Sequence, residues 1–193
     1  MYPLLEAYFA ERTAIDAATM QHVCGFFTLV SAKRGEVLLS AGQVCKHYYF
    51  VNQGCIRLYS INEGGEEATR YFAFEGAFGT SLPSLINQQP AFEYVQAIEA
   101  SELLVISRTD FYHLVDTVAP FAAIYRQILE LSFITAQKRI YGFQGMDALA
   151  RVRWTLEHKP LLLSRISNRM AASYFGISPS TLSRLKAKVW AEV

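Results

Sequence analysis

The sequence lacks any long apolar segment. None of its uninterrupted hydrophobic runs approaches the roughly 20 residues that a membrane-spanning helix requires, although 52% of the 193 residues are hydrophobic. The first twenty residues contain Glu6, Glu11 and Asp16 and lack the basic start of a secretory signal. We therefore expect a folded, cytoplasmic protein.

Cysteine is scarce, since the chain has only Cys24, Cys45 and Cys55. Their odd number and wide spacing exclude a disulfide framework, a CxxC redox pair and a four-cysteine metal or iron–sulfur site within one chain. The four histidines are equally scattered, without the spacing that brings two ring nitrogens to one metal. We therefore expect no metal and no cofactor, and we expect the cysteines to be buried apolar residues.

Basic residues are in the minority in the first part of the chain, and acidic residues are few in the last part. Residues 1–137 hold 8 basic and 14 acidic residues, a balance of −6, whereas residues 138–193 hold 10 and 3, a balance of +7. Lys and Arg are the side chains that chiefly hold phosphates. The basic segment is therefore expected to bind an anionic partner, either nucleic acid or a membrane surface. A merely solvated basic face is the alternative.

Short β-branched and aromatic clusters, separated by glycine turns, fill the chain from about residue 33 to residue 107. Such spacing is typical of a small antiparallel barrel or roll. Short amphipathic helices are expected before it, and residues 79–86 interrupt the strand pattern as a short inserted helix. The expected strands are 36–40, 47–51, 56–61, 68–74, 94–99 and 103–107.

The apolar spacing becomes helical after residue 110. Two apolar stripes run along a predicted helix of about residues 120–143, and Tyr125, Leu129 and Phe133 form one of them. Such a helix can serve its own domain with one stripe and a partner with the other, so we expect a homodimer held by a short coiled coil. Burial of both stripes within one chain is the alternative. The expected dimer contacts are Phe121, Ile124, Ile128, Leu131 and Thr135.

Residues 167–185 carry the sharpest pattern, two short helices joined by a turn at Gly176, after a predicted helix at 147–157. Ser167 can cap the first helix, and Gly176 can adopt the left-handed conformation that ends it. Ser178 and Pro179 suit the cap and the first turn of the second helix. The apolar residues expected in the shared core are Ala171, Phe175, Ile177, Leu182 and Leu185, with the small Ala172 at the crossing.

The second of these helices would present small hydroxyl and basic side chains to solvent. Hydroxyl groups can approach base edges and phosphates, arginine can pair bidentately with guanine, and lysine can neutralise backbone charge. A plain helical hairpin is the alternative. The candidate DNA-binding residues are Ser178, Pro179, Ser180, Thr181, Ser183, Arg184, Lys186 and Lys188.

The sequence resembles the Crp/Fnr family of bacterial transcription regulators over nearly its whole length. The residues that carry the resemblance are 35–42, 49–59 and 74–79 in the roll and 176–184 in the helix-turn-helix, which is similar to a variant common among Bacteroidetes. The resemblance implies an α+β fold with three parts. They are an antiparallel, cyclic-nucleotide-binding-like β-roll (residues 1–115), a long dimerisation helix (116–145) and a winged-helix-type helix-turn-helix domain with a trimmed wing (146–193).

The resemblance further implies a non-enzymatic regulator that binds a near-palindromic site on double-stranded DNA as a homodimer. It places Pro179, Ser180 and Arg184 at the base-reading positions. RNA polymerase and an unidentified small-molecule effector are the other implied partners, and no membrane is involved. Effector binding would reorient the dimer helices and so set the spacing of the two recognition helices.

The effector pocket departs from the family pattern. Cyclic-nucleotide binders of this family carry Gly-Glu at the start of the inserted helix, followed later by an arginine and a small hydroxyl residue. This chain has Gly79-Thr80-Ser81 and then Phe92-Glu93. Without the arginine, the pocket loses charge-assisted hydrogen bonds to a phosphate. We expect a degenerate pocket, formed by Gly79, Thr80, Ser81, Phe92 and Glu93, that does not bind cAMP and is filled by aromatic side chains.

Other classes of function stay open at this point. A small-ligand-binding module whose C-terminal helices dock on a protein would share most of these features. Haem sensing through His47 or His113 is compatible with the sequence. An enzyme on a cupin-like roll would need converging histidine and carboxylate ligands, of which the predicted strands supply only His47.

Overall fold

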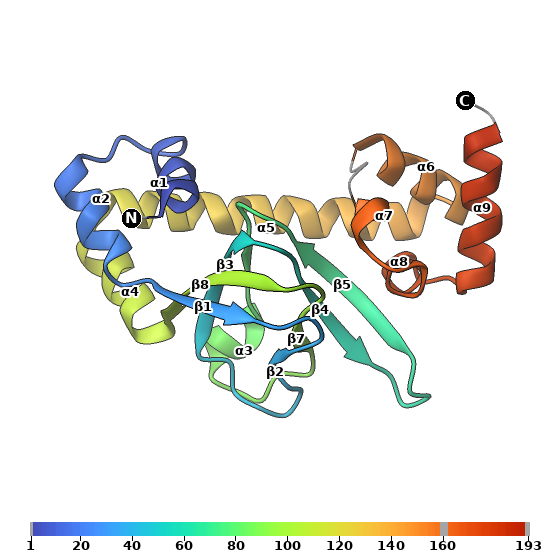
Figure 1. The fold of residues 1–193 in the computed structure, drawn as a ribbon, viewed down its shortest axis with the longest axis horizontal. Helices are drawn as coiled ribbons and strands as arrows, with labels where there is room; N and C mark the ends of the chain where they lie inside the picture. The colour runs from blue at the N-terminus through green and yellow to red at the C-terminus, as the bar shows by residue number, and fades with distance from the viewer. Residues whose placement is uncertain (1, 159–161, 192–193) are drawn as a thin grey trace. The chain divides into compact units, whose positions relative to one another are not determined.

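The computed structural model describes residues 2–158 and 162–191, and Figure 1 shows the order of the elements. Contacts divide the chain into two compact units. The first contains residues 1–60 and 70–130, and the second contains residues 61–69 and 131–193. The long helix, expected from the sequence as a segment of its own, contributes to both units.

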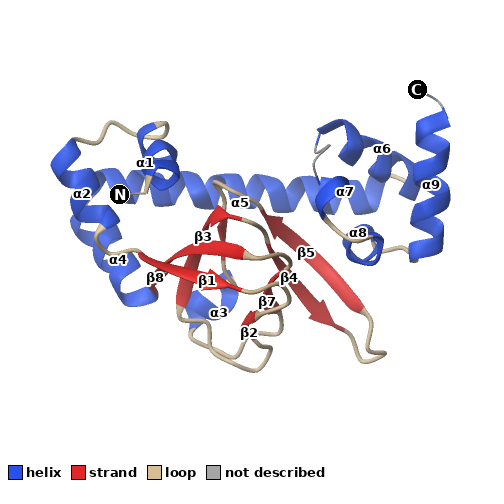
Figure 2. Ribbon diagram, in the orientation of Figure 1, coloured by secondary structure: helices blue, strands red, loops and turns tan. Residues whose placement is uncertain are grey.

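The first unit is a roll in which the described residues form two four-stranded sheets, with strand orders β1-β8-β3-β6 and β2-β7-β4-β5. Figure 2 shows that the strands belong to the middle of the chain, between helical segments. The strands are β1 (Thr28–Ala32), β2 (Val37–Leu39), β3 (His47–Gln53), β4 (Ile56–Ile61), β5 (Glu67–Ala73), β6 (Phe78–Gly79), β7 (Tyr94–Ala97) and β8 (Ser101–Ser107). The helices are α1 (Pro3–Ala10), α2 (Ala17–Cys24), α3 (Leu82–Asn87), α4 (Arg108–Thr117) and the start of α5 (Ala119–Gly145).

The expected antiparallel roll is confirmed, and it contains two strands that the sequence did not predict. Strand β1 pairs with β8, yet four of its five residues are exposed, so no apolar alternation marks it. Strand β6 is only two residues long and pairs with β3 through Phe78 and Gly79. The three cysteines are buried and free, as expected.

Aromatic side chains attach the start of α5 to the roll. Tyr48 on β3 stacks on Phe111 of α4 with ring centroids 3.9 Å apart, and Phe111 meets Phe121 of α5 edge-on at 5.0 Å. Phe121 and Ile124 are 2% and 1% exposed within this core. The prediction that these two residues form a dimer contact is therefore wrong, because the protomer's own roll already covers them.

In the described range, the part of the second unit after residue 131 is helical. It contains the rest of α5, α6 (Ala148–His158), α7 (Leu162–Arg165), α8 (Asn168–Phe175) and α9 (Pro179–Ala191). Residues 146–158 and 162–191 contain no strand. The prediction of a trimmed wing rests on the run that begins at Lys159, and residues 159–161 lie outside the described residues. None of the helices described is both long and apolar enough to cross a membrane.

Candidate nucleic-acid interface and effector site

Helix α8 and the turn after it form as their local chemistry predicts. The Ser167 hydroxyl accepts a hydrogen bond from the Met170 amide at 3.2 Å and so caps α8. Gly176 ends the helix with φ +66°, in the left-handed region that glycine adopts without a Cβ clash. Ala172 and Phe175 are 1% and 2% exposed. The helix is thus fixed at both ends and buried on one side.

Helix α9 begins with a cluster of hydroxyl groups. The Ser178 hydroxyl accepts from the Thr181 amide at 3.1 Å and donates to the Thr181 hydroxyl at 2.8 Å. Its oxygen also lies 3.0 Å from the Ser180 hydroxyl. The amides of a first helical turn attract anions. The start of α9 therefore combines amides and hydroxyls, both of which suit a phosphate or a base edge.

The candidate DNA-binding side chains differ in exposure. Leu182 and Val189 are buried and define the inward face of α9, whereas Thr181 and Lys186 are half-buried. The Lys186 ammonium lies 5.6 Å from the ring centroid of Trp190, a cation–π contact that partly engages its charge. The candidates that are exposed are Ser178, Pro179, Ser180, Ser183, Arg184 and Lys188.

Asn168 is a positioning residue that the sequence reasoning missed. Its side-chain amide donates to the Pro179 carbonyl at 3.0 Å and to the Ser183 hydroxyl at 3.1 Å. These bonds tie the first turn of α8 to the first turn of α9. Ser183 therefore has its hydroxyl engaged before any partner binds. An amide side chain directly after the capping Ser167 was the available signal.

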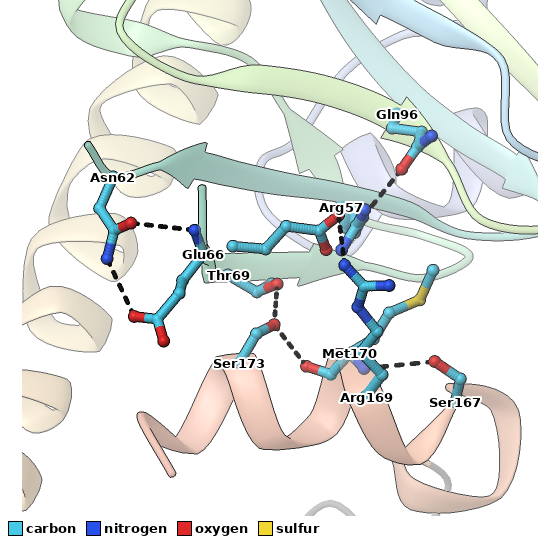
Figure 3. Close-up of polar contacts among 10 residues, drawn as sticks. Arg57, Asn62, Glu66, Thr69, Gln96, Ser167, Arg169, Met170 and Ser173 are labelled. Atoms are coloured by element: carbon cyan, nitrogen blue, oxygen red, sulfur yellow. Dashed lines mark hydrogen bonds and ion pairs between the residues drawn. The ribbon is translucent and has the colours of Figure 1, made fainter. Parts of the chain in front are cut away.

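The second unit also contains residues 61–69, which are the turn between β4 and β5 together with the end of β4 and the start of β5. Figure 3 shows Thr69 meeting Ser173 of α8, with the hydroxyl oxygens 2.6 Å apart. Arg139 of α5 donates to the carbonyls of Thr69 and Tyr174, both at 2.9 Å. The ion pair between Glu67 and Arg169 is longer, at 3.9 Å, and Arg169 is largely exposed. Arg139 and Thr69 thus hold this turn on α8.

The expected effector residues Gly79, Thr80 and Ser81 lie on the stretch that leads into α3. A Cβ atom at Gly79 would come within 2.7 Å of Ile56 Cδ1, so glycine allows close packing here. The Thr80 hydroxyl donates to the His47 carbonyl at 2.8 Å, and Ser81 is buried. Burial, aided by the adjacent Lys46 charge, lowers the pKa of His47. These polar groups bind the loop to the roll.

The second half of the expected effector site needs a correction at Phe92. Its side chain is 75% exposed at the bend before β7, whereas its neighbours Ala91 and Glu93 are buried. Phe92 therefore neither lines nor fills a pocket. Glu93 is 5% exposed, and its carboxylate accepts two 3.0 Å hydrogen bonds from Arg70 of β5. The sequence reasoning missed Arg70, although a lone arginine in an apolar strand was a usable signal.

A separate open groove of about 580 Å³ lies among α2, α4 and the start of α5. Its lining includes His22, His113, Thr19 and Thr117. None of the predicted effector residues lines it. Across the described residues, no group of three or more histidine, cysteine or acidic side chains is placed to hold a metal ion.

The later part of α5 leaves apolar side chains uncovered within the second unit. Among the expected dimer contacts, Ile128 is half-buried, Leu131 is 51% exposed and Thr135 is exposed. Further large apolar side chains are exposed on the same helix, namely Phe133, Ile134, Ile140, Tyr141 and Phe143. The available apolar surface therefore begins at Ile128, about two helical turns later than the sequence suggested.

Comparison with known families gives an independent view of the roll. Residues 29–118 match the family model of the cyclic nucleotide-binding domain. The matched segment runs from the second residue of β1 through α4, and it ends directly before α5 begins. No curated protein matched the chain.

Solved structures match most of the chain. FixK2 from Bradyrhizobium japonicum has a TM-score of 0.76 at 17% identity, with 86% of this chain and 85% of FixK2 covered. The c-di-GMP-responsive regulator CLP from Xanthomonas campestris has 0.72 at 19% identity, with 92% and 93% covered. A CRP/FNR-family transcriptional regulator from Thermus thermophilus has 0.68 at 19% identity, with 86% and 87% covered. The fold predicted by resemblance is thereby confirmed.

Proposed function

Because residues 29–118 match the family model of the cyclic nucleotide-binding domain and the fold is similar to that of Crp/Fnr regulators, we propose that this protein is a DNA-binding transcription regulator. It acts by binding rather than by catalysis, and it would work in the cytoplasm. The observation that carries the proposal is the outward face of α9, where Ser180, Arg184 and Lys188 are exposed opposite the buried Leu182 and Val189.

The electrostatics of the C-terminal segment support this assignment. Residues 138–193 have a formal charge of +7 in a chain whose total is +1. Phosphate neutralisation by such side chains supplies most of the salt-dependent affinity for DNA. Arg184 is exposed and makes only a 3.4 Å contact with the Thr181 hydroxyl, so its guanidinium can turn to a guanine edge.

We further propose that the regulator binds as a homodimer to a near-palindromic duplex site. The exposed apolar side chains after Leu131 support self-association through α5. Two copies of α9 would then enter successive major grooves, roughly 34–36 Å apart. RNA polymerase and a small-molecule effector are further proposed partners. The roll is proposed not to bind cAMP, because Thr80 or Ser81 stands where cyclic-nucleotide binders of the family carry the glutamate at the start of the inserted helix.

The test is selection of genomic duplex fragments by the purified protein without effector, followed by affinity measurements over a range of salt concentrations. Enrichment of an inverted repeat with half-sites one helical turn apart is expected. Arg184→Ala should weaken binding by about 1–3 kcal/mol and relax specificity at one base pair. Lys188→Ala should weaken binding evenly and lower the salt slope by about one.

The matched control is Lys33→Ala, which removes the same charge from an exposed site on the roll. Its affinity and salt slope should equal those of the wild type. If Arg184→Ala and Lys188→Ala also leave both quantities unchanged, the DNA-binding assignment is wrong. The C-terminal helices would then be assigned to docking on another protein.

A further inference from the structure

Glu93 and Arg70 form a closed ion pair on the roll. The two Glu93 carboxylate oxygens accept hydrogen bonds from Arg70 Nε and Nη2, both at 3.0 Å, so the pair is bidentate. The Glu93 side chain is only 7% exposed, whereas that of Arg70 is 52% exposed. The carboxylate is therefore the buried member, and the arginine closes over it from the solvent side.

The position of Glu93 next to β7 shows which groups it meets. Glu93 directly precedes β7, in which alternate residues share a face. Glu93 lies in the bend before β7 and is 5% exposed, and Val95 and Ala97 of β7 are fully buried in the core of the roll. Tyr94 and Gln96 belong to the other face, where they contact Tyr59 and Arg57. The buried Glu93 carboxylate bonds to Arg70 and not to the groups of that other face.

A phosphate bound to Arg70 would need the same N–H groups that donate to Glu93. Carboxylates and phosphates are both recognised bidentately by a guanidinium. A phosphate that took Arg70 would leave the Glu93 carboxylate buried and unpaired, which is strongly unfavourable. It would also place two negative groups side by side. The chain thus supplies its own anion to the arginine.

We propose that Glu93 is a built-in substitute for an anionic effector and that it keeps phosphate-bearing small molecules out of the roll. This inference rests on the proposed regulator function and deepens it, since Arg70 of the roll is already paired with a carboxylate when no ligand is bound. It also assigns a specificity-determining residue: the exclusion is electrostatic, and removal of Glu93 frees Arg70 to accept a phosphate.

The test measures calorimetric binding of cAMP and of inorganic phosphate to the full chain. Compared are the wild type, Glu93→Ala, Glu93→Gln and the double variant Glu93→Ala with Arg70→Ala. Glu93→Ala should bind one or both probes at least about tenfold more tightly than the wild type, the gain of roughly one charge-assisted hydrogen bond. Glu93→Gln keeps the side-chain volume but not the charge, so it should show a smaller gain. The double variant should return to the wild-type level.

Thermal unfolding establishes that each variant is folded before binding is compared. Wild-type binding as tight as that of Glu93→Ala would overturn the proposal, as would folded Glu93→Ala and Glu93→Gln that gain no affinity. Retention of the gain in the double variant would also overturn it, because Arg70 would not be the receiving group. DNA affinity is measured separately on the same proteins, so a failure of the regulator assignment leaves this result readable.

Discussion

Gly176 carries two constraints at one residue. Its φ of +66° lies in the left-handed region, and a Cβ atom there would sit 3.1 Å from the ring of Phe143. Gly176→Ala should lower the free energy of unfolding of the second unit by about 1–2 kcal/mol, the cost of an L-residue in that conformation. Urea denaturation measures the change, and an unfolding midpoint equal to that of the wild type would contradict it.

Gly142 provides the control of opposite sign. It lies inside α5, its φ is not in the left-handed region, and a Cβ atom there would meet nothing within 4 Å. Alanine is the better helix former, so Gly142→Ala should stabilise the chain by up to about 1 kcal/mol. A loss of stability in both variants would show that the two sites respond to added volume and not to backbone conformation.

Single residues were predictable from sequence where their chemistry is local. The caps Ser167 and Ser178 bond to amides three residues ahead, and Gly176 follows directly from helix-end geometry. Arg70 and Glu93 are 23 residues apart, and their pairing depends on how two strands are placed in the sheet. No rule of sequence spacing predicts such a contact. The sequence therefore indicated that the family's arginine is missing after the inserted helix, but it did not indicate that Arg70 pairs with Glu93.

At the scale of elements, the start of β5 is joined to α8 by a part-buried pair of hydroxyl groups, those of Thr69 and Ser173. Ser173 donates to the Met170 carbonyl at 2.8 Å, so Thr69 donates to Ser173. Thr69→Val keeps the shape but removes this donor, and it should lower the free energy of unfolding by about 1 kcal/mol. Thr69→Ser keeps the hydroxyl and should recover most of the loss in the same denaturation assay. Equal losses in both variants would assign the effect to packing of the methyl group.

Strands were predicted correctly where a run of apolar side chains follows a glycine turn. Strands β3, β4 and β5 follow glycine turns and bury alternate or consecutive side chains, and all three were expected. Strand β1 failed because its hydrogen bonds to β8 hold an edge strand whose side chains are mostly exposed. The start of α5 was wrongly assigned to the dimer contact for a related reason. The apolar stripe at Phe121 and Ile124 predicts that these side chains are buried, but it does not predict which surface buries them.

At the scale of the whole molecule, α5 links two kinds of surface. Its first turns are covered by the roll, whereas several large apolar side chains after residue 130 are open to solvent. Successive helical residues are about 100° apart, so Leu131, Ile134 and Tyr141 fall on one side of the helix. Their exposed fractions are 51%, 47% and 65%. Exposed apolar patches of this kind mark interaction surfaces, and a second copy of α5 presents the complementary stripe.

This arrangement predicts the oligomeric state and the residues that control it. Light scattering of the wild type should give twice the chain mass, and Leu131→Glu with Ile134→Glu should give the monomer mass, because the charges would be buried unpaired in the contact. Ser132→Glu adds charge to an exposed site about a third of a turn from Leu131 and should leave the dimer intact. The monomeric variant should also lose affinity for a full inverted repeat while retaining weak binding to one half-site, because only the pairing of two α9 helices has been removed. A wild type of monomer mass under all conditions would refute the dimer, and a monomeric Ser132→Glu would place the contact on another face of α5.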